Sequence, residues 1–355
     1  MIEQFALDIG NKQTKMVSEK TSDVFPSYYL LKQDLGSSLT LIGQQRLIDS
    51  YESNIDPDFT YAWGKEIAQV STDKYIDTIS FDNRYRTNEF KLLVDFSLAN
   101  LAKDYPAAKM SILECTVATG VPSSDYHDEA IRDIITAIKG DHNVRLNGES
   151  LNIRVKEVFV IQQPIGTIYN ELLDSNGYIE NESFLDENVV VVDIGGGTLL
   201  IDTLKSLNLD EKQSGQRDNG AYDLFERIKN LAKQKGIRGL TEYKIEQIVR
   251  RGNSESGYSY QPNKNECIDL TEIILTAQKI YTREVINTIN TTLKDKSQID
   301  TALFTGGGPN VLNSDELKQV FKNSYLVEDS ETATVRGYFK YLRALQQQQE
   351  SDAAE

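Results

Sequence analysis

The sequence predicts an α/β protein that contains two similar domains. Short runs of β-branched residues, typical of buried strands, alternate with longer stretches whose apolar residues recur at helical spacing. Each half of the chain begins with a strand that ends in Asp-Ile-Gly, once at Asp8 and once at Asp193, followed by a short turn and a second strand. With 355 residues, of which 39% are hydrophobic, the chain is large enough to bury a core in each half.

The composition favours an acidic cytoplasmic protein without a membrane span or a disulfide. The formal net charge of −16 repels nucleic-acid phosphates, so we expect no direct, non-specific DNA binding; the charge serves solubility or attracts a basic partner protein. No apolar run approaches the ~18 residues of a membrane span, and no leader segment opens the chain. Cys115 and Cys267 are expected to be buried free thiols, and two histidines, His127 and His142, are too few for a His-based metal site.

The first half predicts a hairpin, a small insertion, and then alternating strands and helices. The hairpin covers residues 4–17, with its tip at 10–13. Residues 24–64 are rich in Tyr, Ser and Gly, with strand-like pieces such as 39–43, and this insertion is either a contact surface or a satellite core. The later elements are a helix over 88–103, a strand over 111–119, a helix capped by Ser124 or Asp125 that ends at Gly140, a hairpin turning at Asn147 and Gly148, a strand over 157–161, and a helix from Gln163 to Leu173.

The second half repeats the order of a hairpin followed by helices and a late strand. Its first strand, 189–194, is a run of valines that reaches Asp193, and the chain returns over 199–204. The later elements are an amphipathic helix over 221–235, short polar elements over 236–265 with a loop at 252–260, a long helix that begins at Asp269 or Thr271 and ends at about Leu293, a strand over 301–304, and a final helix over about 331–346. The glutamine-rich, acidic tail 347–355 is expected to be disordered.

Three glycine turns follow buried strands, and they carry the residues best suited to bind a phosphate. Such a turn leaves backbone N–H groups open to an anion, and a carboxylate at its root suits a hydrated metal ion. Alone, each turn is also typical of an ordinary surface hairpin; the set of three is much more specific. The candidate residues are Asp8, Gly10, Asn11, Lys12 and Lys15 in the first turn, Asp193, Gly195, Gly196, Gly197 and Thr198 in the second, and Gly306, Gly307, Gly308 and Asn310 in the third.

Together the turns predict a site for a nucleoside triphosphate and Mg²⁺. Two facing hairpins hold the phosphates through their amides, and Lys15 adds positive charge. Asp8 and Asp193 converge on one Mg²⁺, which they hold through its water shell. Glycines 306–308 let a nucleoside lie against bare backbone where a Cβ would clash. The weaker candidates for nucleoside contacts, each individually more typical of a solvated helix face, are Asp223, Arg227, Lys279 and Arg283.

These motifs resemble those of the actin and heat-shock-chaperone ATPase superfamily over nearly the whole chain. Residues 8–15 and 193–198 are similar to its two phosphate hairpins, 304–308 to its adenosine turn, and 160–164 and 332–337 to its two connecting segments. The resemblance implies an actin-like ATPase fold, in which two similar ribonuclease-H-like domains with small outer subdomains flank a nucleotide cleft. The implied boundaries are 1–164 plus 328–346 for domain I, with an outer subdomain at about 24–85, and 165–327 for domain II, with an outer subdomain at about 215–265.

The resemblance also implies catalytic roles for Gln163, Asp193 and Asp8. In that superfamily the residue before the proline of the first connecting segment orients the attacking water, and here this residue is Gln163. A neutral amide positions a water molecule but is a poor proton acceptor, so Asp193 is the group expected to polarise it. Alternatively, Gln163 only satisfies backbone groups at a helix N-terminus.

Within the superfamily the sequence most resembles the ParM-type actins, which segregate plasmids. The resemblance rests on the Asp-Ile-Gly-Asn opening at Asp8, the turn at 119–122, the chain length, and the lack of a substrate-binding or membrane module. It implies that ATP, with GTP as an alternative, drives head-to-tail polymerisation of a bacterial, plasmid-encoded cytoplasmic protein. A DNA-binding adaptor of ParR type would link the filament to centromere DNA. A small-molecule (sugar or acid) kinase of the same fold, another bacterial cytoskeletal actin, and a nucleotide-sensing scaffold without turnover are the alternatives.

Overall fold

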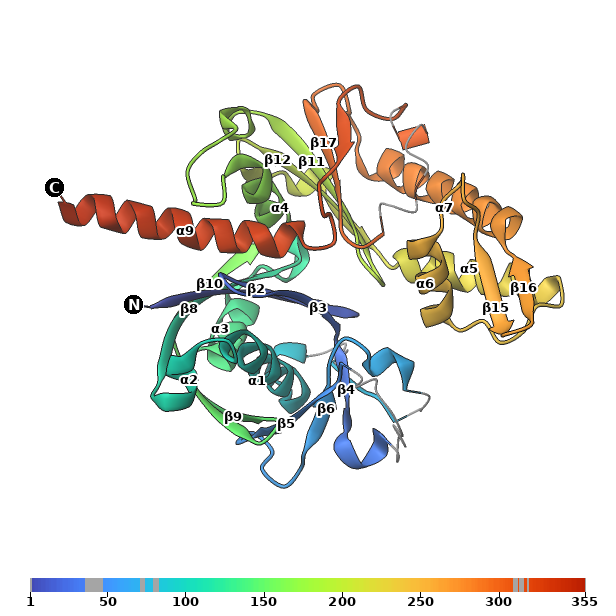
Figure 1. Cartoon of the computed structure of the whole chain (residues 1–355). Helices are drawn as coiled ribbons and strands as arrows, with labels where there is room; N and C mark the ends of the chain where they lie inside the picture. Colours follow the sequence, from blue (N-terminus) through green and yellow to red (C-terminus); the bar gives the residue numbers. More distant parts are fainter. Residues whose placement is uncertain are drawn as a thin grey trace. The chain divides into compact units, whose positions relative to one another are not determined.

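The computed structural model describes residues 2–35, 47–70, 74–78, 83–308, 312, 316–317 and 319–354, and it divides the chain into two compact units (Figure 1). Unit 1 consists of Met1–Glu182 and Thr332–Glu355, and unit 2 of Ser183–Glu331. The sequence placed the first change of domain at 164/165. Unit 1 extends past that point because the helix α4 (Gln163–Leu172) packs along α9 (Ala333–Ala354).

Ten described strands of unit 1 form one mixed sheet in the order β3-β2-β1-β8-β10-β9-β5-β6-β4-β7. The β1–β8 and β8–β10 pairs are parallel, and the other pairs are antiparallel. The strands are β1 (Glu3–Ile9), β2 (Gln13–Ser18), β3 (Ser22–Pro26), β4 (Tyr28–Leu31), β5 (Asp49–Ser53), β6 (Tyr61–Trp63), β7 (Ile76–Asp77), β8 (Leu113–Val121), β9 (Gly140–Leu146) and β10 (Glu149–Gln162).

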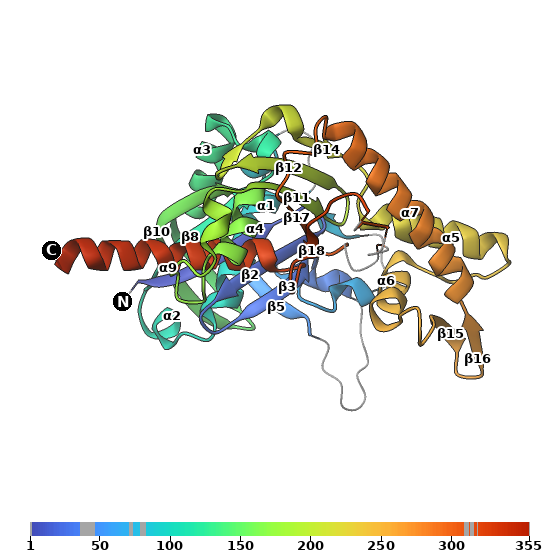
Figure 2. The same cartoon turned by 90° about the horizontal axis from the view of Figure 1, so that it is seen from above.

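Helices cover both faces of this sheet (Figures 1 and 2). Side chains of a strand alternate between faces, so Phe5 and Leu7 pack in the core beside α1, whereas Ala6 contacts the apolar face of α9. The helices of unit 1 are α1 (Asn88–Ala102), α2 (Pro106–Met110), α3 (Asp128–Ile138), α4 and α9. The helix expected at 88–103 is confirmed as α1, and the turn at Asn147 and Gly148, both with positive φ, is confirmed between β9 and β10.

Three expectations for unit 1 need correction. The chain over 123–125 forms a 3-10 turn, so the cap of α3 is His127, whose Nδ1 accepts from the Ala130 amide at 3.4 Å. The second strand of the hairpin that turns at Asn147 and Gly148 and the strand expected at 157–161 are one strand, β10, with a bulge between Val155 and Glu157. The tail is not irregular, because α9 continues to Ala354.

Local chemistry explains why α9 continues so far. Gln, Ala and Glu are good helix formers, and neither Gly nor Pro interrupts residues 338–354. Gln346 Nε2 donates to Glu350 Oε1 one turn later at 2.7 Å, and Tyr178 OH donates to Gln347 Oε1 at 2.8 Å. These contacts order the first part of the segment that composition alone assigned to a disordered tail.

Several large aromatic residues of the insertion belong to a core, whereas Phe59 is exposed. Tyr29, Tyr51 and Trp63 are fully buried, and their rings make edge-to-face or tilted contacts with one another and with Phe96 of α1. A smaller cluster around Leu30 and Ile67 lies beside them. The structure therefore favours the core interpretation of these side chains, while the expected strand-like piece 39–43 lies outside the described residues.

Unit 2 has six described strands in its main sheet, in the order β13-β12-β11-β17-β18, with β14 paired to β12. One face of β11 and β17 packs against α5 and α7 through Val190, Val192 and Phe304. The strands are β11 (Asn188–Ile194), β12 (Leu199–Lys205), β13 (Asn208–Leu209), β14 (Gly215–Arg217), β17 (Thr301–Thr305) and β18 (Ser324–Leu326), with a separate hairpin of β15 (Ser259–Asn263) and β16 (Glu266–Asp269). The helices are α5 (Ala221–Gln234), α6 (Glu242–Arg251) and α7 (Thr271–Thr292).

Short 3-10 helices complete the described secondary structure: η1 (Lys32–Leu35), η2 (Ile67–Gln69), η3 (Arg84–Arg86), η4 (Ser123–Asp125), η5 (Glu182–Leu185) and η6 (Glu211–Gln213). The long helix expected at 271–293 is confirmed as α7. Cys115 is buried as expected, whereas Cys267 is exposed, because β16 lies in the two-stranded hairpin rather than in the main sheet. Across the described ranges, no helix combines the length and apolar character that crossing a membrane requires.

Candidate functional site

The β1–β2 hairpin forms the first glycine turn of the site. Asp8 lies opposite Lys15 and Ile9 opposite Thr14, and the Gly10 amide closes the turn by donating to the Gln13 carbonyl at 3.0 Å. A Cβ on Gly10 would lie 2.9 Å from that carbonyl oxygen, which explains the glycine. Asn11 at the tip is exposed. The turn thus places the exposed Asn11 directly after a glycine at which a side chain would meet backbone.

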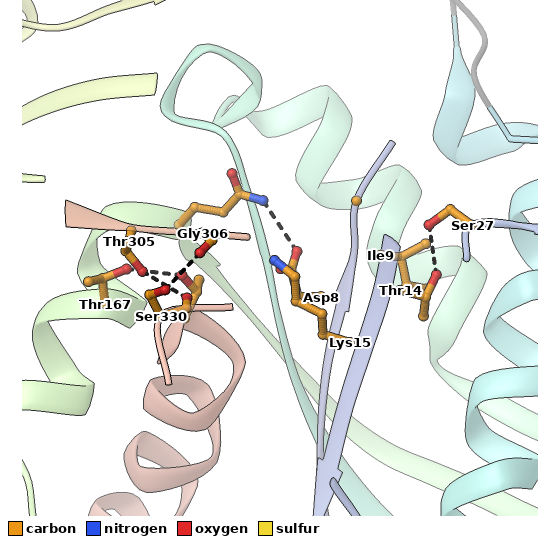
Figure 3. A network of polar contacts seen from close by, with 12 residues as sticks. Asp8, Ile9, Thr14, Lys15, Ser27, Thr167, Thr305, Gly306 and Ser330 are labelled. Carbon is orange, nitrogen blue, oxygen red and sulfur yellow. Dashed lines mark hydrogen bonds and ion pairs between the residues drawn. The ribbon is translucent and has the colours of Figure 1, made fainter. Parts of the chain in front are cut away.

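Asp8, Lys15 and Gln163, which are far apart in the sequence, come together at this hairpin. The Asp8 carboxylate is 3% exposed and accepts from Lys15 Nζ at 3.0 Å, a contact drawn in Figure 3. Its other oxygen accepts from Gln163 Nε2 at 3.3 Å. Gln163 is the first residue of α4, and Pro164 follows it. The Gln163 amide is thus oriented by a buried carboxylate at a helix N-terminus.

Arg84 of η3 also binds the first hairpin, a contact that no motif in the sequence indicates. Its Nη2 donates to the carbonyl oxygens of Ile9 at 2.9 Å and Gly10 at 2.8 Å, and its Nε donates to the Thr78 carbonyl at 3.1 Å. Its guanidinium lies 5.4 Å from the centre of the Phe90 ring. Burial lowers the pKa of Arg84 from its ordinary value, and an arginine nevertheless remains charged at neutral pH.

The β11–β12 hairpin forms the second glycine turn. The Gly195 amide donates to the Thr198 carbonyl at 2.9 Å, in the same arrangement as in the first hairpin. The amides of Ala221 and Tyr222, in the first turn of α5, donate to the Gly195 and Gly196 carbonyls, each at 2.9 Å. The N–H and C=O of one trans peptide point in opposite directions, so the next amides, of Gly196 and Gly197, face away from α5.

The third glycine turn packs directly on the second hairpin. Gly306 has φ +92°, and a Cβ there would lie 2.3 Å from Asp193 Oδ1. The Gly308 amide donates to the Ile194 carbonyl at 2.9 Å. Within unit 2 the fold therefore brings together Asp193, the turn 195–198 and glycines 306–308, as the sequence predicted. Asn310 lies outside the described residues.

Ser330, a residue that sequence reasoning missed, holds the third turn. Its Oγ donates to the Gly306 carbonyl at 2.9 Å, and its own carbonyl accepts from the Gly306 amide at 3.0 Å and from Thr305 Oγ1 at 3.2 Å. These residues are seen together in Figure 3. Ser330 lies in a loop before α9, and no spacing in the sequence relates it to the glycine turn.

The weaker nucleoside candidates lie on α5 and α7. Arg227 Nη2 donates to both carboxylate oxygens of Glu284 at 2.7 and 2.8 Å, which links the two helices. Burial raises the pKa of Asp223, in the first turn of α5. Lys279 and Arg283 are exposed on α7. Arg227 thus links two helices of unit 2. This contact favours the alternative in which the residue belongs to a helix surface and does not bind the nucleoside.

The carboxylates fit a hydrated metal ion better than a directly bound one. Among the described residues, no group of three or more His, Cys, Asp or Glu side chains could hold a metal. Asp8 lies beside the first hairpin in unit 1, and Asp193 lies beside the second hairpin in unit 2. A Mg²⁺ that keeps most of its water needs only isolated carboxylates plus phosphate oxygens. Either carboxylate is therefore compatible with a hydrated Mg²⁺.

Comparisons with known proteins agree with this architecture. Residues 6–166 match the N-terminal domain of actin-like proteins, and residues 188–342 match the Alp7A C-terminal domain. No curated protein matches the sequence. Among solved structures, the apo pSK41 ParM protein is 24% identical with a TM-score of 0.76, covering 98% of this chain and 99% of that one. The actin-like protein Alp7A is 17% identical with a TM-score of 0.79, covering 100% and 99%.

Two other matched structures show states of similar proteins. Bacillus thuringiensis ParM with ATP is 16% identical, with a TM-score of 0.71 and coverage of 98% and 99%. The 15-stranded ParM filament from Clostridium botulinum is 18% identical, with a TM-score of 0.70 and coverage of 96% and 98%.

The two units, each with a glycine hairpin at the end of a buried strand, define a protein of the actin-like class. Since its two matched domains together span most of the sequence, the chain belongs to the family of actin-like proteins, with a C-terminal domain of the Alp7A type. This confirms the resemblance and the fold class that the glycine turns predicted.

Proposed function

We propose that this protein binds ATP with Mg²⁺, hydrolyses it, and assembles head-to-tail into filaments. The observation that carries the proposal is the buried Asp8 carboxylate, which orients the Gln163 amide beside the tip of a glycine hairpin. A carboxylate and an amide held together beside bare amides suit a hydrated metal ion, a water molecule and a phosphate. The matched ParM with ATP and the matched ParM filament support the nucleotide and the assembly.

The residues of each hairpin have separate tasks in this proposal. Phosphate oxygens accept from amides of the turns at 10–12 and 195–198, and Lys15 supplies a positive charge. The glycines 306–308, with Asn310, accommodate the nucleoside. Bound Mg²⁺ neutralises phosphate charge, and Asp8 and Asp193 hold its water shell. GTP is accepted as an alternative only if the base contacts do not discriminate.

For hydrolysis, Gln163 positions the attacking water and Asp193 polarises it. The Gln163 amide cannot act as a strong base, but its orientation is fixed by the bond from its Nε2 to Asp8. Its free carbonyl oxygen is then the atom that accepts a hydrogen bond from water. Because positioning requires only a fixed acceptor, a neutral amide is sufficient at this point.

We also propose that the filaments segregate plasmid DNA in the bacterial cytoplasm. The acidic chain, with a formal net charge of −16, is unsuited to direct contact with DNA phosphates. A basic DNA-binding adaptor of ParR type is therefore the expected link to centromere DNA. Membership of the actin-like family, together with the structural similarity to ParM, supports this proposal.

Phosphate release and sedimentation, measured on the same samples, test the proposed function. The purified protein at micromolar concentration is mixed with ATP and Mg²⁺, without any sugar or organic acid. We expect phosphate release together with protein in the pellet, and neither effect without nucleotide. Phosphate transfer that depends strictly on an added small-molecule acceptor would instead identify a kinase, and ATP binding without turnover would identify a nucleotide sensor.

A further inference from the structure

In both glycine hairpins, carbonyl oxygens of the turn accept hydrogen bonds from another part of the same unit, but the donor groups differ. In unit 2, the backbone amides of Ala221 and Tyr222 at the start of α5 bind the Gly195 and Gly196 carbonyls. In unit 1, the side chain of Arg84 binds the carbonyls of Ile9 and Gly10. Gly10 corresponds to Gly195 of the second hairpin, and Ile9 corresponds to Ile194, whose carbonyl accepts from the Gly308 amide. A helix N-terminus and a guanidinium are both positively polarised groups, so they act on the turn in the same way.

We propose that Arg84 is a positioning residue of the nucleotide site, which orients the amides of the first hairpin toward the phosphates. The proposal rests on the ATP-binding function proposed above. Arg84 does not touch the phosphates in this account; it acts through the backbone of Ile9 and Gly10.

The orientation follows from peptide geometry. Because the Gly10–Asn11 peptide is trans, a Gly10 carbonyl that points at Arg84 makes the Asn11 amide point the opposite way. The preceding peptide provides a check. The Ile9 carbonyl also points at Arg84, and the Gly10 amide indeed donates to Gln13 on the other side, at 3.0 Å. A donor on the carbonyl also polarises the peptide and strengthens the amide as a donor.

The fork of an arginine is required for this contact. Nη2 reaches both carbonyls of the hairpin while Nε binds the Thr78 carbonyl, so the planar group is fixed at two edges. Thr87 Oγ1 donates to the Arg84 carbonyl at 2.8 Å and fixes the backbone of η3. A lysine has a point charge on a flexible stem and cannot make both sets of bonds in one orientation.

Arg86 offers a matched control two residues away. Its side chain is exposed and pairs with Glu129 and Asp133, each at 2.7 Å, rather than with the hairpin. A substitution there removes a positive charge from the same 3-10 turn. The comparison therefore separates the effect of holding the hairpin from that of local charge.

The test compares Arg84→Gln, Arg84→Lys and Arg86→Gln in the full chain. We expect Arg84→Gln to weaken ATP binding by about 10- to 100-fold, the range found when a residue that orients a binding group is lost. Arg84→Lys, with its charge retained, should recover only part of that loss, and Arg86→Gln should bind like the wild type. The Kd for ATP is measured by calorimetry, and the thermal unfolding midpoint shows that each variant is folded.

Amide hydrogen exchange of the nucleotide-free protein tests the same inference without ATP. We expect Arg84→Gln to raise exchange in peptides that cover residues 10–13, and Arg86→Gln to leave it unchanged. The inference is overturned if folded Arg84→Gln binds ATP with a Kd within twofold of the wild type. Where Arg84→Gln does not fold, Arg84→Lys takes its place. The inference is then overturned if Arg84→Lys keeps both the wild-type affinity for ATP and the wild-type amide exchange. If the wild type itself binds no ATP, the proposed function fails while the exchange experiment still decides whether Arg84 holds the hairpin.

Discussion

Asp193 and Gly306 are packed so closely that a Cβ on Gly306 would lie 2.3 Å from Asp193 Oδ1 and 2.5 Å from the Ile194 carbonyl. The proposed metal-holding carboxylate and the third glycine turn are therefore one structural feature of unit 2. Gly306 also has φ +92°, a region that residues with side chains rarely adopt.

The first prediction concerns this contact. Gly306→Ala should destabilise the protein by about 2–4 kcal/mol. The added Cβ would clash with the Ile194 carbonyl and the Asp193 carboxylate, and the positive φ would add backbone strain. The matched control is Gly236→Ala, at φ +80° with open space around the added carbon, which should cost only the strain of about 1–2 kcal/mol. Urea unfolding measures both. Equal losses in the two variants would contradict the close packing.

The second prediction concerns the crossing of α4 and α9. A Cβ on Gly337 would lie 1.7 Å from the Gly166 carbonyl oxygen, so the two helices touch through backbone. Gly337→Ala should force them apart and cost about 3 kcal/mol or more, although alanine favours an isolated helix by roughly 1 kcal/mol. Gln348→Ala, at an exposed position of the same helix, should change stability by less than about 0.5 kcal/mol. A stabilised Gly337→Ala protein, read from its unfolding midpoint, would contradict the crossing.

The third prediction concerns a buried charge pair in unit 1. His142 Nδ1 lies 2.6 Å from Asp95 Oδ1, and its Nε2 donates to the Ile138 carbonyl at 2.7 Å, while Ser53 Oγ donates to the other Asp95 oxygen. Both ring nitrogens face acceptors, which suits the imidazolium form. Burial alone would lower the pKa of His142, but the hydrogen bond and charge of Asp95 outweigh it, so the pKa is raised.

A raised folded-state pKa makes the pair stabilising at low rather than high pH. The stabilisation is fully present below the unfolded pKa of about 6.5 and is lost as pH rises through the folded pKa. The free energy of unfolding should therefore fall over that window, with a slope of at most about 1.4 kcal/mol per pH unit from this group. Urea titrations from pH 6 to 9 measure it. His142→Gln should remove this component, and a slope that survives the substitution would assign it elsewhere.

The fourth prediction separates the roles of two site residues. Asp193→Ala should abolish ATP hydrolysis, whereas Gln163→Ala should slow it by about 10²-fold or more and leave the Kd for ATP within a few-fold. Gln162→Ala, the neighbouring helix cap whose side chain makes no capping bond, is the control. Phosphate release and calorimetry give kcat and Kd for each variant. Unchanged turnover in Gln163→Ala would show that this amide does not position the water.

The sequence anticipated the parts of the site that depend on backbone constraints. Glycines at 10, 306 and 308 are required by the close approaches found in the structure, so their pattern is visible in the residues themselves. Each of these glycines has a chemical reason that a single residue type expresses. The water-positioning role of Gln163, by contrast, is implied only by the superfamily resemblance, and it stays a prediction.

Arg84 and Ser330 could not be anticipated in the same way. Each binds the backbone carbonyl of a distant turn. Every residue type has a backbone carbonyl, so the sequence does not show which carbonyl accepts such a bond. The expectations for the tail and for Cys267 were wrong for another reason. Composition and local neighbours do not specify whether a segment packs on the rest of a unit. Asp95, the partner of His142, lies in α1, 47 residues away in the sequence, so the neighbours of His142 in sequence do not indicate the pair.

The measurement that tests the central claim most directly is negative-stain electron microscopy of the purified wild-type protein with ATP and Mg²⁺, compared with the same protein without nucleotide. We expect filaments only in the nucleotide-containing sample, and longer-lived filaments for Asp193→Ala if it still binds ATP. A wild-type protein that binds ATP but stays monomeric at every nucleotide and salt concentration would contradict the claim that this chain is a polymerising ATPase.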